Sequence, residues 1–278
     1  MKKIILYTLL ALSCSCSATA QVNNQNNQTM DRTALTKEIY HQLFGGEALT
    51  GQGTDPELMN ILQKFIFGDV FHTGVLNNKQ RELITVVTLV AQQALPQLKA
   101  HTNAALNVGV TPIELREAVY QCAPYIGYPR TLNAVGVINE VFNEKGIQLP
   151  LENQGTVNDE NRFAKGKAIQ QSLYGNEIKQ LMSTLPGKFK DYVPQFLTEA
   201  DFGDYYTRGG LDIKDRELLM YCVLATLGAE FQLKAHAKGC LKAGVTKEEL
   251  VAAMVQCIGY IGFPNAINAI NIINKTEL

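Results

Sequence analysis

Residues 79–101 read KQRELITVVTLVAQQALPQLKAH, and residues 214–236 read KDRELLMYCVLATLGAEFQLKAH. The offset of 135 residues holds on both sides, so that residues 67–134 and 202–269 match without a gap at 31 of 68 positions. Such a match over this length indicates a tandem duplication of one domain. Polar residues that both copies keep are therefore candidates for a shared site.

The repeat continues toward the N-terminus at a different offset. Leu43-Phe44-Gly45 matches Leu173-Tyr174-Gly175 at 130 residues, which leaves an insertion of 135 − 130 = 5 residues in the second copy. The segment before the second copy is rich in Asn, Gln, Pro and Gly, a composition typical of linkers. We predict a first domain over 34–147, a linker over 148–160 and a second domain over 161–278.

Both copies carry helix signals, and no alternating strand pattern competes, so the predicted fold is all-α. Asn77 and Asp212 stand at N-cap positions. Thr111 and Thr246 open capping boxes, and Gly109 and Gly244 are typical of helix C-termini. The runs 83–91 and 218–227 are almost wholly apolar, which predicts helices that are buried all round. We expect the two copies to pack together, and the chain to form a homo-oligomer.

The first twenty residues have the pattern of a secretory signal peptide. Lys2-Lys3 precede an apolar run, and Ala18-Thr19-Ala20 is typical of a cleavage site. We predict a signal peptide over 1–20, a disordered leader over 21–33 and a periplasmic location. Attachment to a lipid through Cys14 or Cys16 is the alternative.

The composition limits the classes of partner that we expect for this chain. The net charge is −1 and no block of like charge occurs, so the sequence lacks the basic footprint of a nucleic-acid-binding protein. No apolar stretch of about 18 residues predicts a membrane span. Neither a phosphate-binding glycine loop nor a metal-ligand spacing is present, so we expect a small-molecule substrate and no cofactor or metal.

The four cysteines beyond the predicted signal peptide leave two interpretations open. Cys122, Cys222, Cys240 and Cys257 are either small buried apolar residues or disulfide partners. Cys240 stands four residues after His236, and a Cys–His pair would make the thiol more reactive.

Helix geometry sorts the polar residues that both copies keep. His101 and His236 are either structural residues or groups that donate or accept a proton near neutral pH, a role to which histidine is suited. Gln97 and Gln232 precede them by four residues and share their face, whereas Lys99 and Lys234 precede them by two and point elsewhere. Two more pairs have two interpretations each. Glu82 and Glu217 either favour the helix dipole or orient the histidines. Arg81 and Arg216 are either solvated or bind a substrate carboxylate.

Taken together, these residues resemble the carboxymuconolactone decarboxylase family. The segments that carry the resemblance are Arg216-Glu217-Leu218, Lys234-Ala235-His236, the run from Gly244 to Leu250 and Tyr260-Ile261-Gly262-Phe263-Pro264, each with its counterpart in the first copy. The resemblance covers both copies. It implies small all-helical domains that assemble as trimers or hexamers, so a tandem chain would form a trimer.

The family has a thiol-peroxidase branch and a decarboxylase branch. The first carries a Glu nineteen residues before the His, and this chain keeps that spacing twice (101 − 82 and 236 − 217). The two cysteines of that branch are replaced by Ala94 and Gln97 and by Ala229 and Gln232, so its thiol cycle is excluded. The resemblance therefore favours cofactor-free decarboxylation of a small carboxylated lactone or a related acid.

The resemblance also suggests roles. We expect His101 and His236 to supply the proton, Glu82 and Glu217 to orient them, Arg81 and Arg216 to bind the carboxylate, and Gln97 and Gln232 to donate to the developing oxyanion. Two alternatives stay open: an antioxidant peroxidase that uses Cys240 or Cys257, and a non-catalytic oligomeric ligand-binding protein. If only one copy is active, we expect it to be the second.

Overall fold

The computed structural model describes residues 31–277. The predicted signal peptide, the alternative lipid-attachment cysteines and residues 21–30 of the predicted leader lie outside this range. Within it the chain forms helices and connecting segments with no β-strand, which confirms the predicted all-α class.

The first copy runs from the first helix to α7. Its helices are α1 (Arg32–Phe44), α2 (Pro56–Gln63), π-helix η1 (Lys64–Asp69), 3₁₀-helix η2 (Val70–His72), α3 (Asn78–Gln92), α4 (Leu95–Asn107), α5 (Pro112–Gln121), α6 (Ala123–Ile126) and α7 (Tyr128–Glu144). Helix α1 thus begins within the predicted leader, two residues before the predicted start of the domain.

The second copy repeats this order with additions. Its helices are α8 (Arg162–Tyr174), α9 (Glu177–Leu181), η3 (Met182–Thr184), α10 (Phe189–Phe196), π-helix η4 (Leu197–Tyr205), α11 (Ile213–Leu227), α12 (Glu230–Lys242) and α13 (Lys247–Lys275). Helices α9 and η3 lie in the region that carries the five extra residues predicted from the two offsets, and α10 is the counterpart of α2.

The predicted helix ends are present. Asn77 and Asp212 accept hydrogen bonds from the backbone of α3 and α11. Thr111 and Thr246 form complete capping boxes with Glu114 and Glu249. These caps fix where α3, α5, α11 and α13 begin, and therefore which faces of these helices meet.

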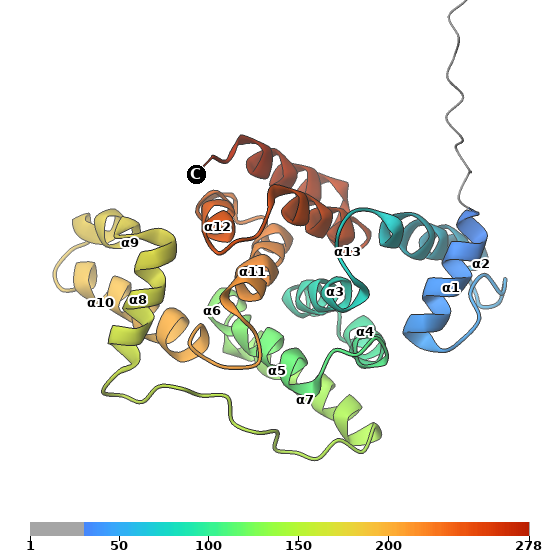
Figure 1. The fold of residues 1–278 in the computed structure, drawn as a ribbon, viewed down its shortest axis with the longest axis horizontal. Coiled ribbons are helices and arrows are strands. Elements are labelled where there is room, and N and C mark those ends of the chain that lie inside the picture. The colour runs from blue at the N-terminus through green and yellow to red at the C-terminus, as the bar shows by residue number, and fades with distance from the viewer. Residues whose placement is uncertain (1–30, 278) are drawn as a thin grey trace, which may run out of the picture. The chain divides into compact units, whose positions relative to one another are not determined.

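The two apolar helices form the centre of a shared core. Helices α3 and α11 contact each other, as Figure 1 shows, and α5 and α13 each contact both of them. One continuous cluster of buried side chains contains residues of both copies, among them Ile84, Val87, Met220 and Val223. The prediction that the copies pack together is confirmed.

In the described part of the chain, α13 is the helix that is long and apolar enough to cross a membrane by length and composition. A kink at Gly262, whose φ is 77°, divides it, and its contacts with α3, α11 and α12 are those of a core helix.

Candidate functional site

The structure brings each predicted glutamate to its predicted histidine. In the first copy His101 Nδ1 lies 2.8 Å from Glu82 Oε2. In the second copy His236 Nδ1 lies 3.4 Å from Glu217 Oε2. Both glutamates are fully buried on the apolar helices α3 and α11, and both histidines come from the next helix along the chain. The spacing of nineteen residues therefore places these two groups in contact.

In the second copy a tyrosine stands between the two groups. The Tyr174 hydroxyl lies 2.5 Å from Glu217 Oε2 and 2.9 Å from His236 Nδ1. Burial raises the pKa of Tyr174 well above its usual value, so the hydroxyl keeps its proton. Because that one proton goes to the carboxylate, Nδ1 of His236 must donate to the tyrosine. This arrangement leaves Nε2 as the free nitrogen, and it has no hydrogen bond to the described part of the chain.

The first copy has lost this hydroxyl together with the space for it. The residue equivalent to Tyr174 is Phe44, whose ring lies edge-on to His101. A Cβ added to Gly239 would clash with the Tyr174 hydroxyl. The equivalent of Gly239 in the first copy is Ala104, which is possible there because Phe44 carries no oxygen. The two differences therefore form one matched pair.

A second tyrosine holds the other carboxylate oxygen in the second copy only. Tyr206 donates its hydroxyl to Glu217 Oε1 at 2.6 Å. The equivalent residue of the first copy is Phe71, and Glu82 Oε1 is buried there without a hydrogen-bond partner. Glu217 is thus held at both oxygens, whereas Glu82 is held at one.

A buried carboxyl group, Asp201, completes the second site. It comes from π-helix η4, is 5 % exposed and accepts a hydrogen bond of 3.3 Å from the Gln121 amide. Burial raises its pKa to about 7, against a weaker opposing effect of His236. The equivalent residue in the first copy is Ile66, which is buried and apolar. Only the second site has this proton-holding group.

Each histidine faces a tyrosine of the other copy. Tyr260 lies beside His101, with its hydroxyl 3.5 Å from Nε2. Tyr125 lies beside His236 with ring centres 5.7 Å apart, but its hydroxyl is 3.2 Å from that of Tyr206. The Tyr125 hydroxyl is thus paired with Tyr206 and not with Nε2 of His236. Both sites are therefore built across the boundary between the copies.

A cavity of about 650 Å³ opens at the second site. Its polar wall consists of His236, Tyr174, Tyr125, Asp201, Gln232, Gln170 and Glu177. The remaining wall is largely apolar and comes from α9, η3, α11 and α12; it includes Leu181, Met182, Leu224, Leu227 and Phe231. We call this cavity the His236 pocket. Its size and lining are typical of small-molecule sites.

The two arginines do not reach this pocket, and this differs from their predicted role. Arg81 and Arg216 are at most 1 % exposed. Arg81 donates to the Leu76, Val70 and Thr73 carbonyls and to Gln256, and Arg216 to the Arg208 and Gly209 carbonyls and to Gln121. Their guanidinium groups tie the helices of one copy to the other. A contact with a substrate carboxylate is not made from these positions.

Arg216 acts on the site indirectly. It holds Gln121 Oε1 at 2.9 Å, and this turns the Gln121 amide toward Asp201. In the first copy Gln256 receives the same contact from Arg81 but donates to Thr85, because Ile66 offers no acceptor.

The two glutamines are placed differently. Gln232 lines the His236 pocket from α12, on the face that the four-residue spacing predicts. Gln97 is exposed on α4, and His101 beside it lies between the rings of Phe44 and Tyr260. Of the two predicted substrate-binding glutamines, Gln232 thus lines the pocket.

The cysteines are free and buried. Cys240 donates to the backbone carbonyl of Glu217 at 3.4 Å, and burial raises its pKa well above the usual value. A buried thiol with a raised pKa is a poor nucleophile. The interpretation as small buried residues therefore fits all four, and a peroxidase centred on Cys240 has no support in this geometry.

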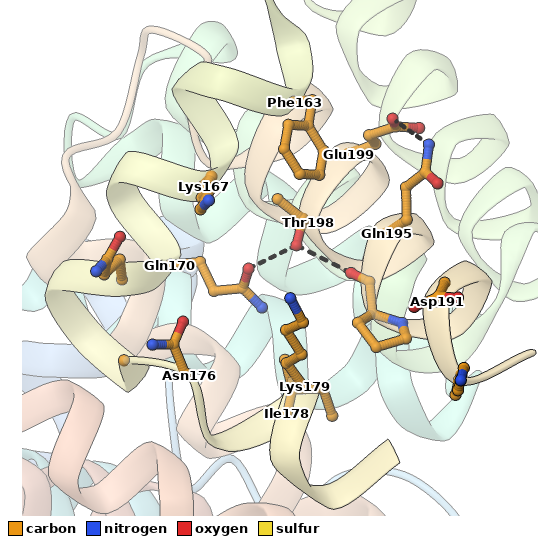
Figure 2. A pocket seen from close by; sticks show the side chains of 14 residues that line it. Phe163, Lys167, Gln170, Asn176, Ile178, Lys179, Asp191, Gln195, Thr198 and Glu199 are labelled. Carbon is orange, nitrogen blue, oxygen red and sulfur yellow. Dashed lines mark hydrogen bonds between the residues drawn. The ribbon is translucent and has the colours of Figure 1, made fainter. Parts of the chain in front are cut away.

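A second cavity adjoins the His236 pocket and shares Gln170 and Ile178 with it. Figure 2 shows Lys179 reaching into this cavity from α9, below Gln170, whose side chain is held by Thr198. Lys167 and Lys190 also line it. The lysines of this region therefore stand outside the His236 pocket. Among residues 31–277 no group of three His, Cys, Asp or Glu side chains is placed to hold a metal ion.

Three residues of the second site were missed by sequence reasoning: Tyr174, Tyr206 and Asp201. Each lies at a position where the copies differ, opposite Phe44, Phe71 and Ile66. A search for polar residues kept in both copies could not find them. The signal was the opposite one, a polar residue in one copy at a position that is apolar in the other.

Comparison with known proteins agrees with this geometry. The carboxymuconolactone decarboxylase family model matches residues 56–140 and 192–275. The 4-carboxymuconolactone decarboxylase of Acinetobacter baylyi is 30% identical over 109 residues, which cover 39% of this chain and 81% of that protein. Nitrosuccinic acid decarboxylase of Metarhizium robertsii is 36% identical over 84 residues, which cover 30% of this chain and 59% of that protein. Peroxisomal protein 2 of Schizosaccharomyces pombe is 24% identical over 141 residues, half of this chain and 65% of that protein.

Relatives named as decarboxylases support a function of that kind for this chain. The family model matches each copy once, at the places where the two Glu–His pairs lie, and the two matches together span more than half of the sequence. The chain therefore belongs to the carboxymuconolactone decarboxylase family, as a tandem member with two copies of the domain.

Proposed function

We propose that this protein is a carboxy-lyase that decarboxylates a small carboxylated lactone or a related acid in the His236 pocket, without a cofactor. The observation that supports this most directly is the state of His236. Its Nδ1 is anchored through Tyr174 to a buried carboxylate, and its Nε2 is free on the wall of a cavity. A histidine held in this way is suited to deliver one proton in a fixed direction.

The chemistry needs a hydrogen-bond donor and a proton donor from the protein. When the bond between the carboxylate and its carbon breaks, the electron pair moves into a conjugated carbonyl and carbon dioxide leaves. The oxygen that gains charge needs a hydrogen-bond donor, and we assign this role to the amide of Gln232, which lines the pocket. The carbon then takes a proton, for which His236 is the acid, and solvent returns that proton to Nε2.

Glu217 stabilises the charged form of His236 during this cycle. Its two oxygens are held by Tyr174 and Tyr206, so it stays in place when the imidazole gains and loses its proton. Asp201 lies on the same pocket and holds a proton near neutral pH. It keeps the pocket from gathering negative charge as the oxyanion forms.

The test is turnover by protein that lacks residues 1–20, with carboxymuconolactone, which carries two carboxylates, and an alkyl β-keto monoacid offered in parallel, and carbon dioxide release as readout. We expect His236→Ala to abolish turnover and His101→Ala to retain it. Unchanged turnover in a variant that lacks both histidines would refute the assignment. Stabilisation by ligands without any turnover would favour a binding protein instead.

We also propose that the protein is exported and forms a homo-oligomer. The first proposal rests on the pattern of residues 1–20. The second rests on exposed apolar residues that recur at equivalent positions of both copies: Leu58 and Val193, Ile61 and Phe196, Tyr128 and Phe263, Leu132 and Ile267. N-terminal sequencing of the secreted protein and light scattering test the two proposals separately.

A further inference from the structure

The wall of the His236 pocket is poor in positive charge. Among the residues that line it, the ionisable side chains other than tyrosine are Asp201, Glu177 and His236, and neither lysine nor arginine is present. Arg81 and Arg216, which could have bound carboxylates, are buried and donate to the protein itself. The nearby lysines line the adjoining cavity, beyond Gln170 and Ile178 (Figure 2).

The rest of the wall is apolar and comes from several elements. Leu224 and Leu227 stand on α11, Phe231 on α12, and Leu181 and Met182 on α9 and η3. Leu227 and Phe231 are 38% and 63% exposed, so they offer apolar surface that a ligand in the pocket can cover. The first copy has Gln92 and Pro96 at these two positions, so it shares neither the leucine nor the aromatic ring.

We propose that the substrate of the His236 pocket is an acid with one carboxylate and an apolar body, and not a compact diacid. This rests on the decarboxylation proposed above. The single carboxylate would lie near His236, and the apolar body would cover Leu227 and Phe231. A second carboxylate would enter an apolar region without a cation, where a charged group loses its hydration and gains no partner.

The reaction step is the same for such an acid. In a β-keto acid, the bond from the α-carbon to the carboxylate breaks and its electron pair forms an enolate with the β-carbonyl. Carbon dioxide leaves, and His236 returns one proton to the α-carbon. No electron donor or acceptor outside the substrate is needed.

Binding tests the substrate class apart from turnover. Octanoate and octanedioate have the same chain length and differ in one carboxylate, so calorimetry of the full mature protein at pH 7 compares one with two charges. We expect octanoate to bind at least about tenfold more tightly, since the diacid must bury an unpaired charge or leave its tail in water. Tighter binding of octanedioate would overturn the proposal.

A variant that adds the missing cation sharpens this test. Leu227→Arg should reverse the preference toward octanedioate, whereas Gln92→Arg, the same change at the equivalent position of the first copy, should leave it unchanged. Loss of the difference between these two variants would contradict the placement of the ligand in this pocket.

Turnover of matched β-keto acids separates this inference from the proposed function. Faster decarboxylation of the alkyl monoacid than of the diacid, above the spontaneous rate, would support both. Faster decarboxylation of the diacid would overturn the substrate class and leave the decarboxylase standing. Selective binding of octanoate without decarboxylation of either acid would retain the pocket's preference and refute the reaction.

Discussion

The first and second copies keep the same Glu–His pair, but they differ in the groups around it. Around His236 stand Tyr174, Tyr206 and Asp201, and a cavity opens beside it. Around His101 the equivalent positions hold Phe44, Phe71 and Ile66, and Tyr260 lies against its Nε2. The Glu–His pair is thus common to both copies, whereas the two tyrosine hydroxyls, the Asp201 carboxyl and the cavity beside the histidine belong to the second copy.

The two copies show the same Glu–His pair in two different surroundings. Each site takes a tyrosine from the other copy, and the second site also takes Gln121, so both copies are needed to build either site. A first copy with an apolar surround can still supply Tyr125 and Gln121 to the second site. We infer that the first copy supports the site of the second, and the expectation from sequence that the second copy is the active one stays a prediction.

The largest expected effect is on turnover when the histidines are replaced separately. His236→Ala should lower kcat/KM by about 10²–10⁴-fold, the usual contribution of a positioned proton donor. His101→Ala should lower it less than about threefold, because that ring faces Tyr260 and not a substrate cavity. Steady-state kinetics of the two variants decides the matter, and equal losses would show that both copies catalyse.

The next effect concerns stability and its dependence on pH. The pKa of Asp201 is raised by burial to about 7, above its usual value of 3.8, so the folded protein holds a proton that the unfolded chain releases. The free energy of unfolding should therefore fall as the pH rises from about 4 to about 7, by roughly 2–4 kcal/mol. In Asp201→Asn this part of the slope should vanish, and the variant should be more stable than the wild type above pH 7.

Urea denaturation at several pH values measures this dependence. Asp191→Asn, at an exposed position of α10, is the matched control and should keep the wild-type slope. If Asp201→Asn and the wild type lose stability in parallel, Asp201 does not hold a proton in the folded state.

A smaller effect on turnover tests the bridging tyrosine. Tyr174→Phe turns the second site into the arrangement of the first and should lower kcat by about tenfold, as is usual for a residue that orients a catalytic group. Gly239→Ala should give a similar loss, because its Cβ would occupy the space of the Tyr174 hydroxyl. The reciprocal change, Phe44→Tyr with Ala104→Gly, should leave kcat unchanged. An increase there would show that His101 had lacked only this hydroxyl.

Sequence alone was sufficient for much of the fold. The constant offset revealed two copies, the caps at Asn77, Asp212, Thr111 and Thr246 fixed helix starts, and the apolar runs identified α3 and α11 as the shared core. These features are local in the chain or periodic, so the pattern of residues reports them directly. The Glu–His contact was also foreseen, since both groups were kept in both copies at one spacing.

The surroundings of the site were harder to predict, for physical reasons. Tyr174 reaches Glu217 and His236 across 43 and 62 residues, which no helical spacing encodes. The arginines next to the glutamates were expected at the substrate, but a residue adjacent in the helix points about a quarter turn away. That turn brings Arg81 and Arg216 to carbonyls of the loops before α3 and α11 and to the other copy.

The smallest expected effect concerns Glu82 Oε1, which is buried without a hydrogen-bond partner. A buried carboxylate oxygen without a hydrogen bond costs about 1–3 kcal/mol, part of which a nearby donor can recover. Phe71→Tyr should place a hydroxyl at Glu82 Oε1 as Tyr206 does at Glu217, and raise the free energy of unfolding by about 1 kcal/mol. Tyr206→Phe should lower the free energy of unfolding by about 1 kcal/mol or more, since it leaves Glu217 Oε1 without its hydrogen-bond donor. Thermal and urea unfolding of both variants give the comparison. A stabilising Tyr206→Phe would mean that the tyrosine is strained in the second site, and that its hydroxyl is kept for catalysis at the expense of stability.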